Sequence, residues 1–169
     1  KETESGRTKT FNWFCDDTWR FESFSKHACK LFTVCSTPER QYIEKFKNIG
    51  YENILLGIWH ANIELFPKEK IQKKYDMSFC GGFNPDRELA TRHLNECGVQ
   101  IERFSGLEQK QMLESIAQTK IGLNFTKNFT QGTPQTQMKL RLFEVPAAQS
   151  MLLTEYHEGI ENYFEVDKE

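Results

Sequence analysis

The sequence predicts an α/β fold in which helices cover both faces of parallel β-sheets. Three observations carry this prediction. Short apolar runs alternate with helical patterns of about 10–14 residues, as in βαβ units. Residues 53–59 and 150–153 are almost wholly apolar, which is typical of strands buried on both faces. Hydrophobic residues make up 38% of the 169 residues, enough for a packed core.

The first part of the chain is predicted to contain three strands and two helices. The strands are residues 10–15, 29–36 and 53–61, and the helices are residues 17–28 and 38–48. Pro38 suits the first turn of the second helix, whose initial N–H groups have no partner within the helix, and Gly50 suits its end. Residues 63–75 are charged, broken by proline and without strong periodicity, which predicts a linker between two domains.

The alternation of strands and helices resumes after this linker. The predicted strands are residues 76–83, 99–104, 121–125 and 150–155, and the predicted helices are residues 84–98, 107–120, 135–148 and 158–164. Asn84 followed by Pro85 predicts a well-capped start for the first of these helices.

Charge and hydropathy exclude several functions. The net charge of −2 argues against broad electrostatic binding of nucleic acid. No apolar run approaches the roughly 20 residues that cross a bilayer, so no transmembrane segment is expected. Five cysteines without a CxxC pair indicate reduced thiols and a cytoplasmic location, with peripheral attachment to a membrane left open.

Metal and nucleophile patterns are also missing. The spacings of cysteine and histidine do not match those of zinc ligands, so no metal site is expected. His27, His93 and His157 have no acid or cysteine at nucleophile or metal spacing and are expected to be surface or packing residues.

A glycine turn follows the strand predicted at 76–83. Gly81 and Gly82 let the backbone approach a ligand, and the next helix offers unpaired N–H groups to an anion. Arg87 can add a second contact to a phosphate. The segment matches neither the P-loop nor the dinucleotide fingerprint. A phosphate-binding turn and a plain strand-to-helix connection therefore both remain open.

A second concentration of charge lies in "KLRLFEV", residues 139–145. Lys139 and Arg141 fall in the first turns of the predicted helix, and Glu144 shares the face of Arg141 three residues later. Such charges usually form a solvated ion pair. Their neighbours are apolar, however, so the helix is expected to be largely buried and its charges to need partners. The pattern suggests a held phosphate and a held sugar hydroxyl.

The segment "KLRLFEVPAAQSMLLTEYHEGIENYF" resembles the nucleotide-sugar-binding half of GT-B glycosyltransferases. It is most similar to the spore-maturation-protein-like branch (glycosyl transferase group 1), with its R-x-F-E, small residues and L-L-T-[DE]. The resemblance extends back through "DMSFCGGFNPDRE" to "NWFCDDTWRF". It implies a fragment with Rossmann-like sheets: residues 1–62 end the first domain, 63–75 are the linker, and 76–169 form an incomplete nucleotide-sugar-binding domain.

The same resemblance implies roles for individual residues. A nucleoside-diphosphate sugar would donate its sugar to a glycan, lipid or protein acceptor, without a metal or other cofactor. Glu144 would accept hydrogen bonds from the ribose. Arg141 and Lys139 would face the diphosphate, which side chains and helix dipole must neutralise. Gly81–Gly82 would lie nearest the sugar phosphate, and residues 104–106 beside the base.

Two positions depart from the family pattern. Many relatives carry a second glutamate eight residues before the ribose-binding one, where this chain has Thr136. Gln149 stands where relatives commonly have glycine. Both positions bear on contacts to the sugar. The alternative function is therefore a non-catalytic nucleotide-sugar or protein-binding module on the same fold.

The acidic pair Asp16 and Asp17 ends the first strand. It would suit a metal in a DxD glycosyltransferase or in a receiver domain, but the DxD class places its acids elsewhere in its fold, and the receiver lacks its later acceptor aspartate. Asp17 is expected to cap the first helix, to face the cleft as a catalytic residue, or both. Trp59, His60 and Asn62 fall on the crossover between the two halves, and His60 is the histidine expected to act as a general base.

Overall fold

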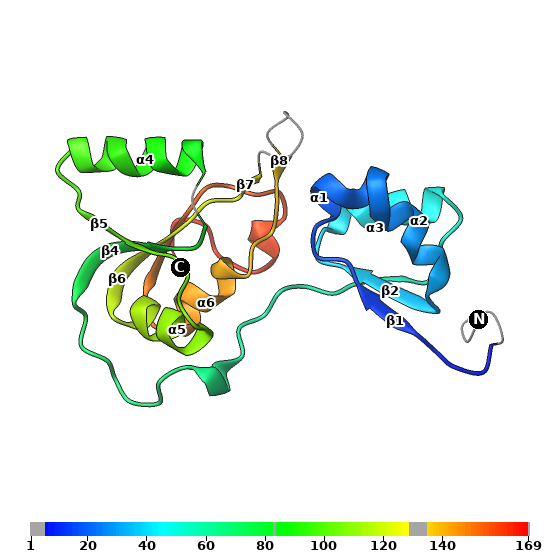
Figure 1. Ribbon diagram of the computed structural model, residues 1–169, viewed down its shortest axis with the longest axis horizontal. Coiled ribbons are helices and arrows are strands. Elements are labelled where there is room, and N and C mark those ends of the chain that lie inside the picture. The colour runs from blue at the N-terminus through cyan, green and yellow to red at the C-terminus, as the bar shows by residue number, and fades with distance from the viewer. Residues whose placement is uncertain (1–5, 83, 129–134, 169) are drawn as a thin grey trace. The chain divides into compact units, whose positions relative to one another are not determined.

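The computed structural model describes residues 6–82, 84–128 and 135–168. The chain divides into two compact units. Unit 1 comprises Lys1–Trp59, Lys127–Met138 and His157–Gly159, and unit 2 comprises His60–Thr126, Lys139–Tyr156 and Ile160–Glu169. Both units contain parallel sheets flanked by helices (Figure 1), so the predicted fold class is confirmed. The division into two GT-B domains with a linker at 63–75 stays a prediction.

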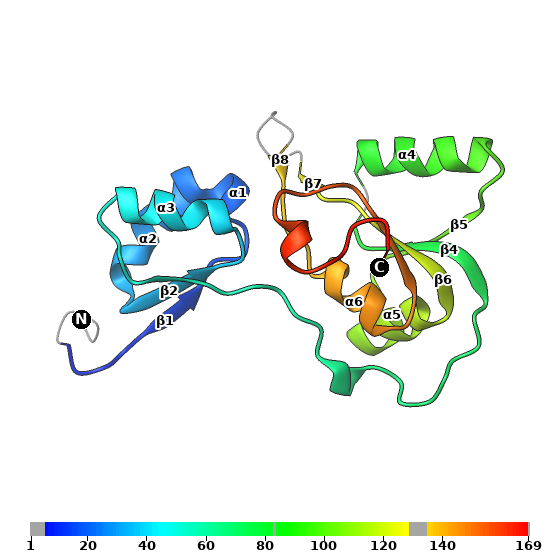
Figure 2. The ribbon, with the colours of Figure 1, turned by 180° about the vertical axis from the view of Figure 1, so that it is seen from behind.

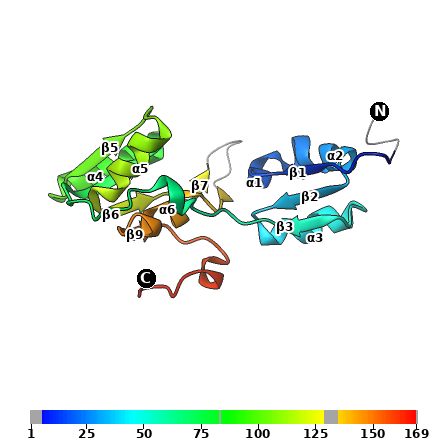
Figure 3. The same cartoon turned by 90° about the horizontal axis from the view of Figure 1, so that it is seen from below.

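Unit 1 is built on a parallel sheet with the strand order β1–β2–β3, which lie side by side in Figure 3. The strands are β1 (Phe11–Trp13), β2 (Val34–Thr37) and β3 (Ile54–Leu56). The helices are α1 (Asp17–Arg20), α2 (Lys26–Ala28) and α3 (Arg40–Asn48), with a π-helical turn (Phe21–Ser25) between α1 and α2. The antiparallel hairpin of β7 (Lys127–Asn128) and β8 (Gln135–Thr136) also belongs to this unit.

An aromatic cluster forms the core of unit 1. Phe46 of α3 is fully buried, and its ring centroid lies 5.7 Å from that of Phe14, 4.9 Å from that of Phe21 and 6.3 Å from that of Tyr51. Helix α3 buries one side, because Tyr42 and Phe46, four residues apart, are both buried.

Unit 2 is built on a parallel sheet with the strand order β5–β4–β6–β9. The strands are β4 (Tyr75–Cys80), β5 (Ile101–Phe104), β6 (Thr119–Asn124) and β9 (Met151–Thr154). The helices are α4 (Pro85–Glu96), α5 (Gln109–Ala117) and α6 (Arg141–Ala147), with 3-10 helices at Ile63–Leu65 and Ile160–Asn162.

Alternate residues of β4 enter different buried clusters. Met77 and Phe79 belong to one cluster, against which Leu94 of α4 packs. Cys80 belongs to another, together with side chains of α5 and α6. Figures 1 and 2 show α4 on one side of the sheet and α5 and α6 on the other. Strand β4 is thus buried on both faces. The apolar runs at 53–59 and 150–153, predicted to be buried on both faces, instead form the edge strands β3 and β9, in which Leu55, Met151 and Leu153 are exposed.

The strand predicted at 29–36 begins later than expected. Cys29–Leu31 forms a 3-10 helix that continues the preceding helical segment, and β2 starts at Val34. The sheet begins where Thr10 and Thr33 bond to each other: each backbone N–H donates to the other's hydroxyl, at 3.0 and 3.1 Å. Apolar character alone does not separate a buried helical turn from a strand.

The helix predicted at residues 135–148 also begins later than expected. Gln135–Thr136 forms β8, and α6 begins only at Arg141. Gln137 is buried because its Nε2 donates to the carbonyl of Cys15 at 2.8 Å and to Asp16 Oδ1 at 3.0 Å. These long-range bonds hold the backbone out of the helix.

Gly122 of β6 permits a close approach to α6. A Cβ atom at this position would lie 2.7 and 2.8 Å from the two methyl carbons of Val145. We therefore expect Gly122→Ala to lower the free energy of unfolding by about 1–3 kcal/mol through overpacking, as urea denaturation would measure. A Val145→Ala change in the same chain should relieve part of this loss. At Gly82 an added Cβ would meet no atom of the described residues within 4 Å, so Gly82→Ala should cost less than about 0.5 kcal/mol. Equal losses at the two glycines would contradict the explanation.

Candidate functional site

The glycine turn lies at the carboxyl end of β4, where open parallel sheets bind their ligands. Gly81 has φ of +154°, and its N–H donates to the carbonyl of Phe104 at 2.9 Å. A Cβ at Gly81 would lie 3.0 Å from the ring of Phe79. The structure therefore favours glycine at position 81, whereas a Cβ added at Gly82 would meet no atom of the described residues within 4 Å. The bond to Phe104 also places residues 104–106 directly after the strand end beside this turn.

Arg87 folds back onto the glycine turn from the first turn of α4. Asn84 caps this helix as predicted, because its side-chain oxygen accepts the N–H of Arg87 at 3.0 Å. The Arg87 guanidinium donates to the carbonyl of Gly82 at 2.5 Å and lies 5.4 Å from the centroid of the Phe79 ring. Its Nε is buried and has no hydrogen-bond partner in the described part of the chain. Arg87 thus has an N–H group that could donate a hydrogen bond to a ligand oxygen.

Burial and a nearby carboxylate shift the pKa of Arg87 in opposite directions. Desolvation lowers the pKa of Arg87, and Glu155 raises it by a smaller amount. Glu155 follows β9, and its Oε2 accepts the N–H of Thr126 after β6 at 3.0 Å. The carboxyl ends of β4, β6 and β9 therefore contribute charged or polar groups to one edge of the sheet. Glu155 is the acid of the L-L-T-[DE] pattern in the sequence, which gave it no role of its own.

Arg141 and Glu144 form a buried ion pair at the start of α6. Arg141 Nη1 donates to Glu144 Oε2 at 2.5 Å, and the two side chains are 16% and 5% exposed. Arg141 Nη1 also lies 3.3 Å from the sulfur of Met112. Burial raises the pKa of Glu144, while Arg141 opposes this shift. The expectation that these charges would be buried and in need of partners is confirmed.

The ion pair lies close to the end of β4. Burial raises the pKa of the Cys80 thiol to about 11, while Arg141 lowers it and Glu144 raises it by smaller amounts. Such electrostatic effects fall off with distance, so both charges lie near the residue that precedes Gly81. Lys139, placed by prediction within the helix, is half-buried and precedes it instead. The structure thus brings the Arg141–Glu144 pair, Gly81 and Arg87 to the carboxyl edge of one sheet.

Residues 69–169 match the family model described as glycosyl transferase-like. This stretch is more than half of the chain and contains the glycine turn, Arg87 and the Arg141–Glu144 pair. The chain belongs to the glycosyl transferase-like family. None of the curated proteins matches it. The predicted resemblance to glycosyltransferases is confirmed at this level, and the GT-B and spore-maturation-protein-like assignments stay predictions.

Asp17 occupies an unexpected position in unit 1 of this glycosyl transferase-like chain. It is the first residue of α1 and not its cap, since Asp16 holds the cap position, without a side-chain bond to the helix. The predicted capping role of Asp17 is therefore wrong. The Asp17 carboxylate is fully buried, and neither oxygen has a well-formed hydrogen bond to residues 6–82, 84–128 or 135–168.

Burial raises the pKa of Asp17 to about 6. The hydroxyls of Ser25 and Thr37 lower it, and the carboxylates of Glu39 and Asp16 raise it further. A carboxylate with such a pKa can take up and release a proton near neutral pH, which is what a general base requires. The geometry of a catalytic role for Asp17 stays a prediction.

The remaining predicted residues have simpler surroundings. His60 is exposed. Asn62 caps the 3-10 helix that follows it, accepting the N–H of Glu64 at 3.2 Å. Thr136 lies in β8. Gln149 has φ of +56°, a backbone region that glycine adopts without strain. This φ explains why glycine suits the position in the family pattern described above.

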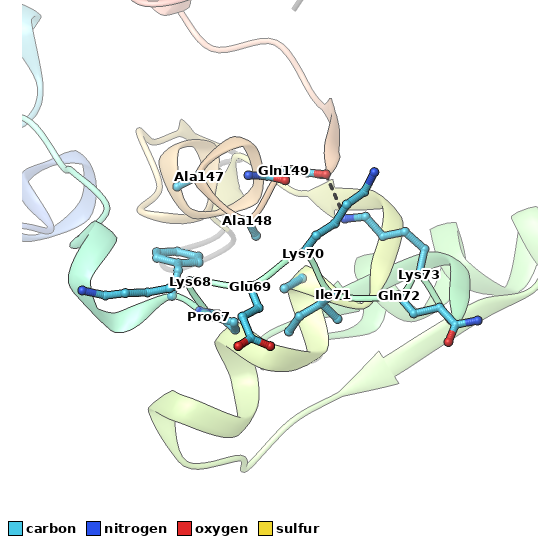
Figure 4. A pocket seen from close by; sticks show the side chains of 12 residues that line it. Pro67, Lys68, Glu69, Lys70, Ile71, Gln72, Lys73, Ala147, Ala148 and Gln149 are labelled. Atoms are coloured by element: carbon cyan, nitrogen blue, oxygen red, sulfur yellow. Dashed lines mark hydrogen bonds between the residues drawn. The ribbon is translucent and has the colours of Figure 1, made fainter.

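A cavity of about 360 Å³ lies at the other edge of the unit 2 sheet (Figure 4). Its lining residues are Phe66–Lys73, Ala117 and Ala147–Gln149, which precede strands or end helices. Lys73 Nζ donates there to the carbonyl of Gln149 at 2.8 Å (Figure 4) and to Ser150 Oγ at 2.9 Å. Because parallel sheets bind ligands at the carboxyl ends of their strands, the glycine turn and not this cavity is the candidate site.

Two further features of the described residues bear on function. Among the described residues, no group of three or more histidine, cysteine, aspartate or glutamate side chains is arranged to hold a metal ion. No helix in residues 6–82, 84–128 and 135–168 is long and apolar enough to cross a membrane.

Proposed function

We propose that this chain binds a nucleoside-diphosphate sugar at the carboxyl edge of the unit 2 sheet and transfers the sugar to an acceptor hydroxyl. The buried Arg141–Glu144 pair carries the proposal. Burying two charges costs more than a surface ion pair returns, so a pair held at a ligand-binding edge suggests a role beyond stability. Its place within the glycosyl transferase-like region supports the same reading.

In this proposal, each charged residue recognises one part of the donor. Arg141 donates a hydrogen bond to Glu144 Oε2. The other oxygen of the Glu144 carboxylate can accept hydrogen bonds from ribose hydroxyls. Arg87, whose Nε lacks a partner in the described structure, donates to a diphosphate oxygen. Lys139 and the N-terminus of α4 add positive charge to the same group. Residues 104–106, next to Gly81, lie beside the base.

The reaction needs no redox step. The bond between the anomeric carbon and the diphosphate oxygen breaks, and its electron pair leaves with the diphosphate. A new bond forms between the anomeric carbon and the acceptor oxygen, whose proton passes to a base. Cations at Arg87 and Arg141 stabilise the departing diphosphate without a metal. Asp17 and His60 are the predicted proton acceptors, and the acceptor is a glycan, a lipid or a protein.

We expect Glu144→Gln to weaken binding of UDP, GDP or ADP, whichever the wild-type chain binds, by about 10- to 100-fold. This range corresponds to the loss of a charged hydrogen bond of about 1.5–3 kcal/mol. Isothermal titration calorimetry would measure it, with the exposed Glu96→Gln as the matched control. Equal affinity in the wild type and Glu144→Gln would refute the ribose role.

A non-catalytic nucleotide-sugar or protein-binding module is the second candidate function. Thr136, at the position of the second family glutamate, favours it, because no carboxylate is available there. A screen of UDP-, GDP- and ADP-sugars by thermal shift and then by hydrolysis separates the two functions: turnover favours the transferase, and binding without turnover favours the module.

The free cysteines and the family match support a cellular location and a division into domains. All five cysteines are free thiols, which supports the predicted cytoplasmic location, because such thiols persist in reducing compartments. The match to residues 69–169 supports our proposal that residues 76–169 form the nucleotide-sugar-binding domain and residues 1–62 the end of a preceding Rossmann-like domain.

A further inference from the structure

A buried carboxylate in unit 1 collects hydrogen bonds from three parts of the chain. Glu39, which precedes α3, is fully buried. Its Oε1 accepts the backbone N–H of Met138 at 2.8 Å. Its Oε2 lies 3.2 Å from His157 Nε2 and accepts from Gln41 Nε2 at 3.1 Å. His157 is 1% exposed, so both partners of the Glu39–His157 pair are shielded from water.

Burying the Glu39 carboxylate costs free energy, and its hydrogen-bond donors must offset this cost. A buried carboxylate is stable only when its oxygens receive well-placed donors. Two of the donors to Glu39 come from residues about a hundred positions or more away in the sequence, so local structure does not supply them. Asp17, which also lies near Glu39, has no donor with good geometry among the described residues. The donors are therefore gathered at one carboxylate and not spread over the cluster.

The two distant donors directly flank, in sequence, the segment that contains the Arg141–Glu144 pair. Met138 directly precedes residues 139–156, and His157 directly follows them. This segment contains α6 and β9, and with α6 the Arg141–Glu144 pair. One carboxylate thus holds both ends of the segment, which removes much of its freedom to open.

We propose that Glu39 is a positioning residue, which holds Met138 and His157 together and so fixes the geometry of the Arg141–Glu144 helix for nucleotide binding. The proposal rests on the function proposed above. Glu39 itself touches no substrate in it. Its effect is preorganisation: a helix whose flanking residues are fixed loses less freedom when a ligand binds.

Glu39→Gln tests the proposal. The amide oxygen can still accept from one donor, but its NH₂ group faces the other two. We expect the Kd for the preferred nucleoside diphosphate to rise by about tenfold, as small misplacements of binding groups do. Hydrogen exchange of the backbone amides in α6 should become faster. The control is Glu44→Gln on α3, the helix that follows Glu39. The exposed Glu44 carboxylate pairs with Lys47 at 2.9 Å, so this change should affect neither measurement.

A pair of substitutions at His157 distinguishes positioning from general stability. His157→Gln keeps an N–H donor near the position of Nε2, whereas His157→Leu keeps the bulk and loses the donor. We expect His157→Leu to behave like Glu39→Gln, and His157→Gln to restore the Kd to within about twofold of the wild type. Should Glu39→Gln fail to fold, this pair decides the question alone.

The proposal and the function it rests on can fail separately. If the wild-type chain binds none of the nucleotides, the proposed function is wrong, while hydrogen exchange of α6 still tests Glu39. If Glu39→Gln and His157→Leu keep wild-type exchange in α6, Glu39 does not position this helix, even where the melting temperature falls. If only the melting temperature falls and the Kd is unchanged, the role of Glu39 is structural and the proposal is overturned.

Discussion

Replacing Asp17 by asparagine should stabilise the protein by about 2–3 kcal/mol at pH 7.5. The carboxylate is fully buried without a well-formed hydrogen bond to the described residues, and its pKa is about 6 against an ordinary value of 3.8. Each pKa unit corresponds to 1.36 kcal/mol, so the difference of about two units penalises the charged form by about 3 kcal/mol. Asparagine has nearly the same shape and carries no charge to desolvate.

The gain should depend on pH in a defined direction. Because the folded pKa lies above the unfolded one, the folded state binds the proton more tightly. The penalty is therefore fully present above about pH 6 and fades as the pH falls towards 3.8. We expect urea denaturation to show the full gain of Asp17→Asn at pH 7.5 and a much smaller one at pH 4.5.

The control for Asp17 is Glu52→Gln, an exposed carboxylate of the same unit, which should change stability by less than about 0.5 kcal/mol at either pH. A gain of equal size at pH 4.5 and pH 7.5 would show that charge burial at Asp17 is not its source. Proteins tolerate such a penalty most readily at functional positions. Loss of turnover in the stabilised Asp17→Asn variant would therefore support its predicted catalytic role.

Replacing Arg141 by methionine should destabilise the protein by about 3–5 kcal/mol. Glu144 is 4% exposed, and Arg141 is the cation that opposes the effect of burial on it. Removing one partner of a buried pair leaves an uncompensated charge in the interior, which costs far more than the pair contributes when it is intact. Methionine keeps most of the apolar bulk, so the loss reports mainly on charge.

The double variant Arg141→Met/Glu144→Gln should recover most of this loss, because it leaves no buried charge. Lys47→Met is the matched control: it breaks an exposed pair with the same spacing of three residues and should cost less than about 1 kcal/mol. If guanidinium denaturation gives the single and double variants the same stability, the Arg141–Glu144 pair is not coupled as the structure implies. The double variant also offers a folded protein for nucleotide-binding measurements without either charge.

Local patterns in the sequence predicted much of unit 2. The apolar run of β4, the Asn84 cap and the glycine turn depend on residues near in sequence, and the structure contains all three. Burial of the Arg141–Glu144 pair was predictable from its apolar neighbours. The family pattern pointed to position 149 as one where glycine is usual, and the φ of Gln149 gives the physical reason.

The errors have two physical causes. The late start of β2 reflects a local ambiguity between a buried helical turn and a strand, and the late start of α6 reflects long-range contacts. The start of α6 was misplaced because Gln137 bonds to Asp16, and Met138 to Glu39, residues far away in the sequence. His157, predicted to be a surface or packing residue, is a packing residue, and its contact with Glu39 is equally distant in the sequence. Its partner, Glu39, showed only a local signal for a helix start. No periodicity reports a hydrogen bond between residues about a hundred positions or more apart.

The discontinuity of unit 1 affects how the polypeptide matures on the ribosome. The unit draws on Lys1–Trp59, Lys127–Met138 and His157–Gly159, so its first stretch leaves the exit tunnel long before the others are translated. During that interval Glu39 has neither the Met138 amide nor the His157 ring to bond. Residues 1–59 therefore cannot reach their final state during early synthesis, unlike a domain that is contiguous in sequence. For the same reason, no single proteolytic cut separates the two units from each other, because segments of unit 1 lie between segments of unit 2.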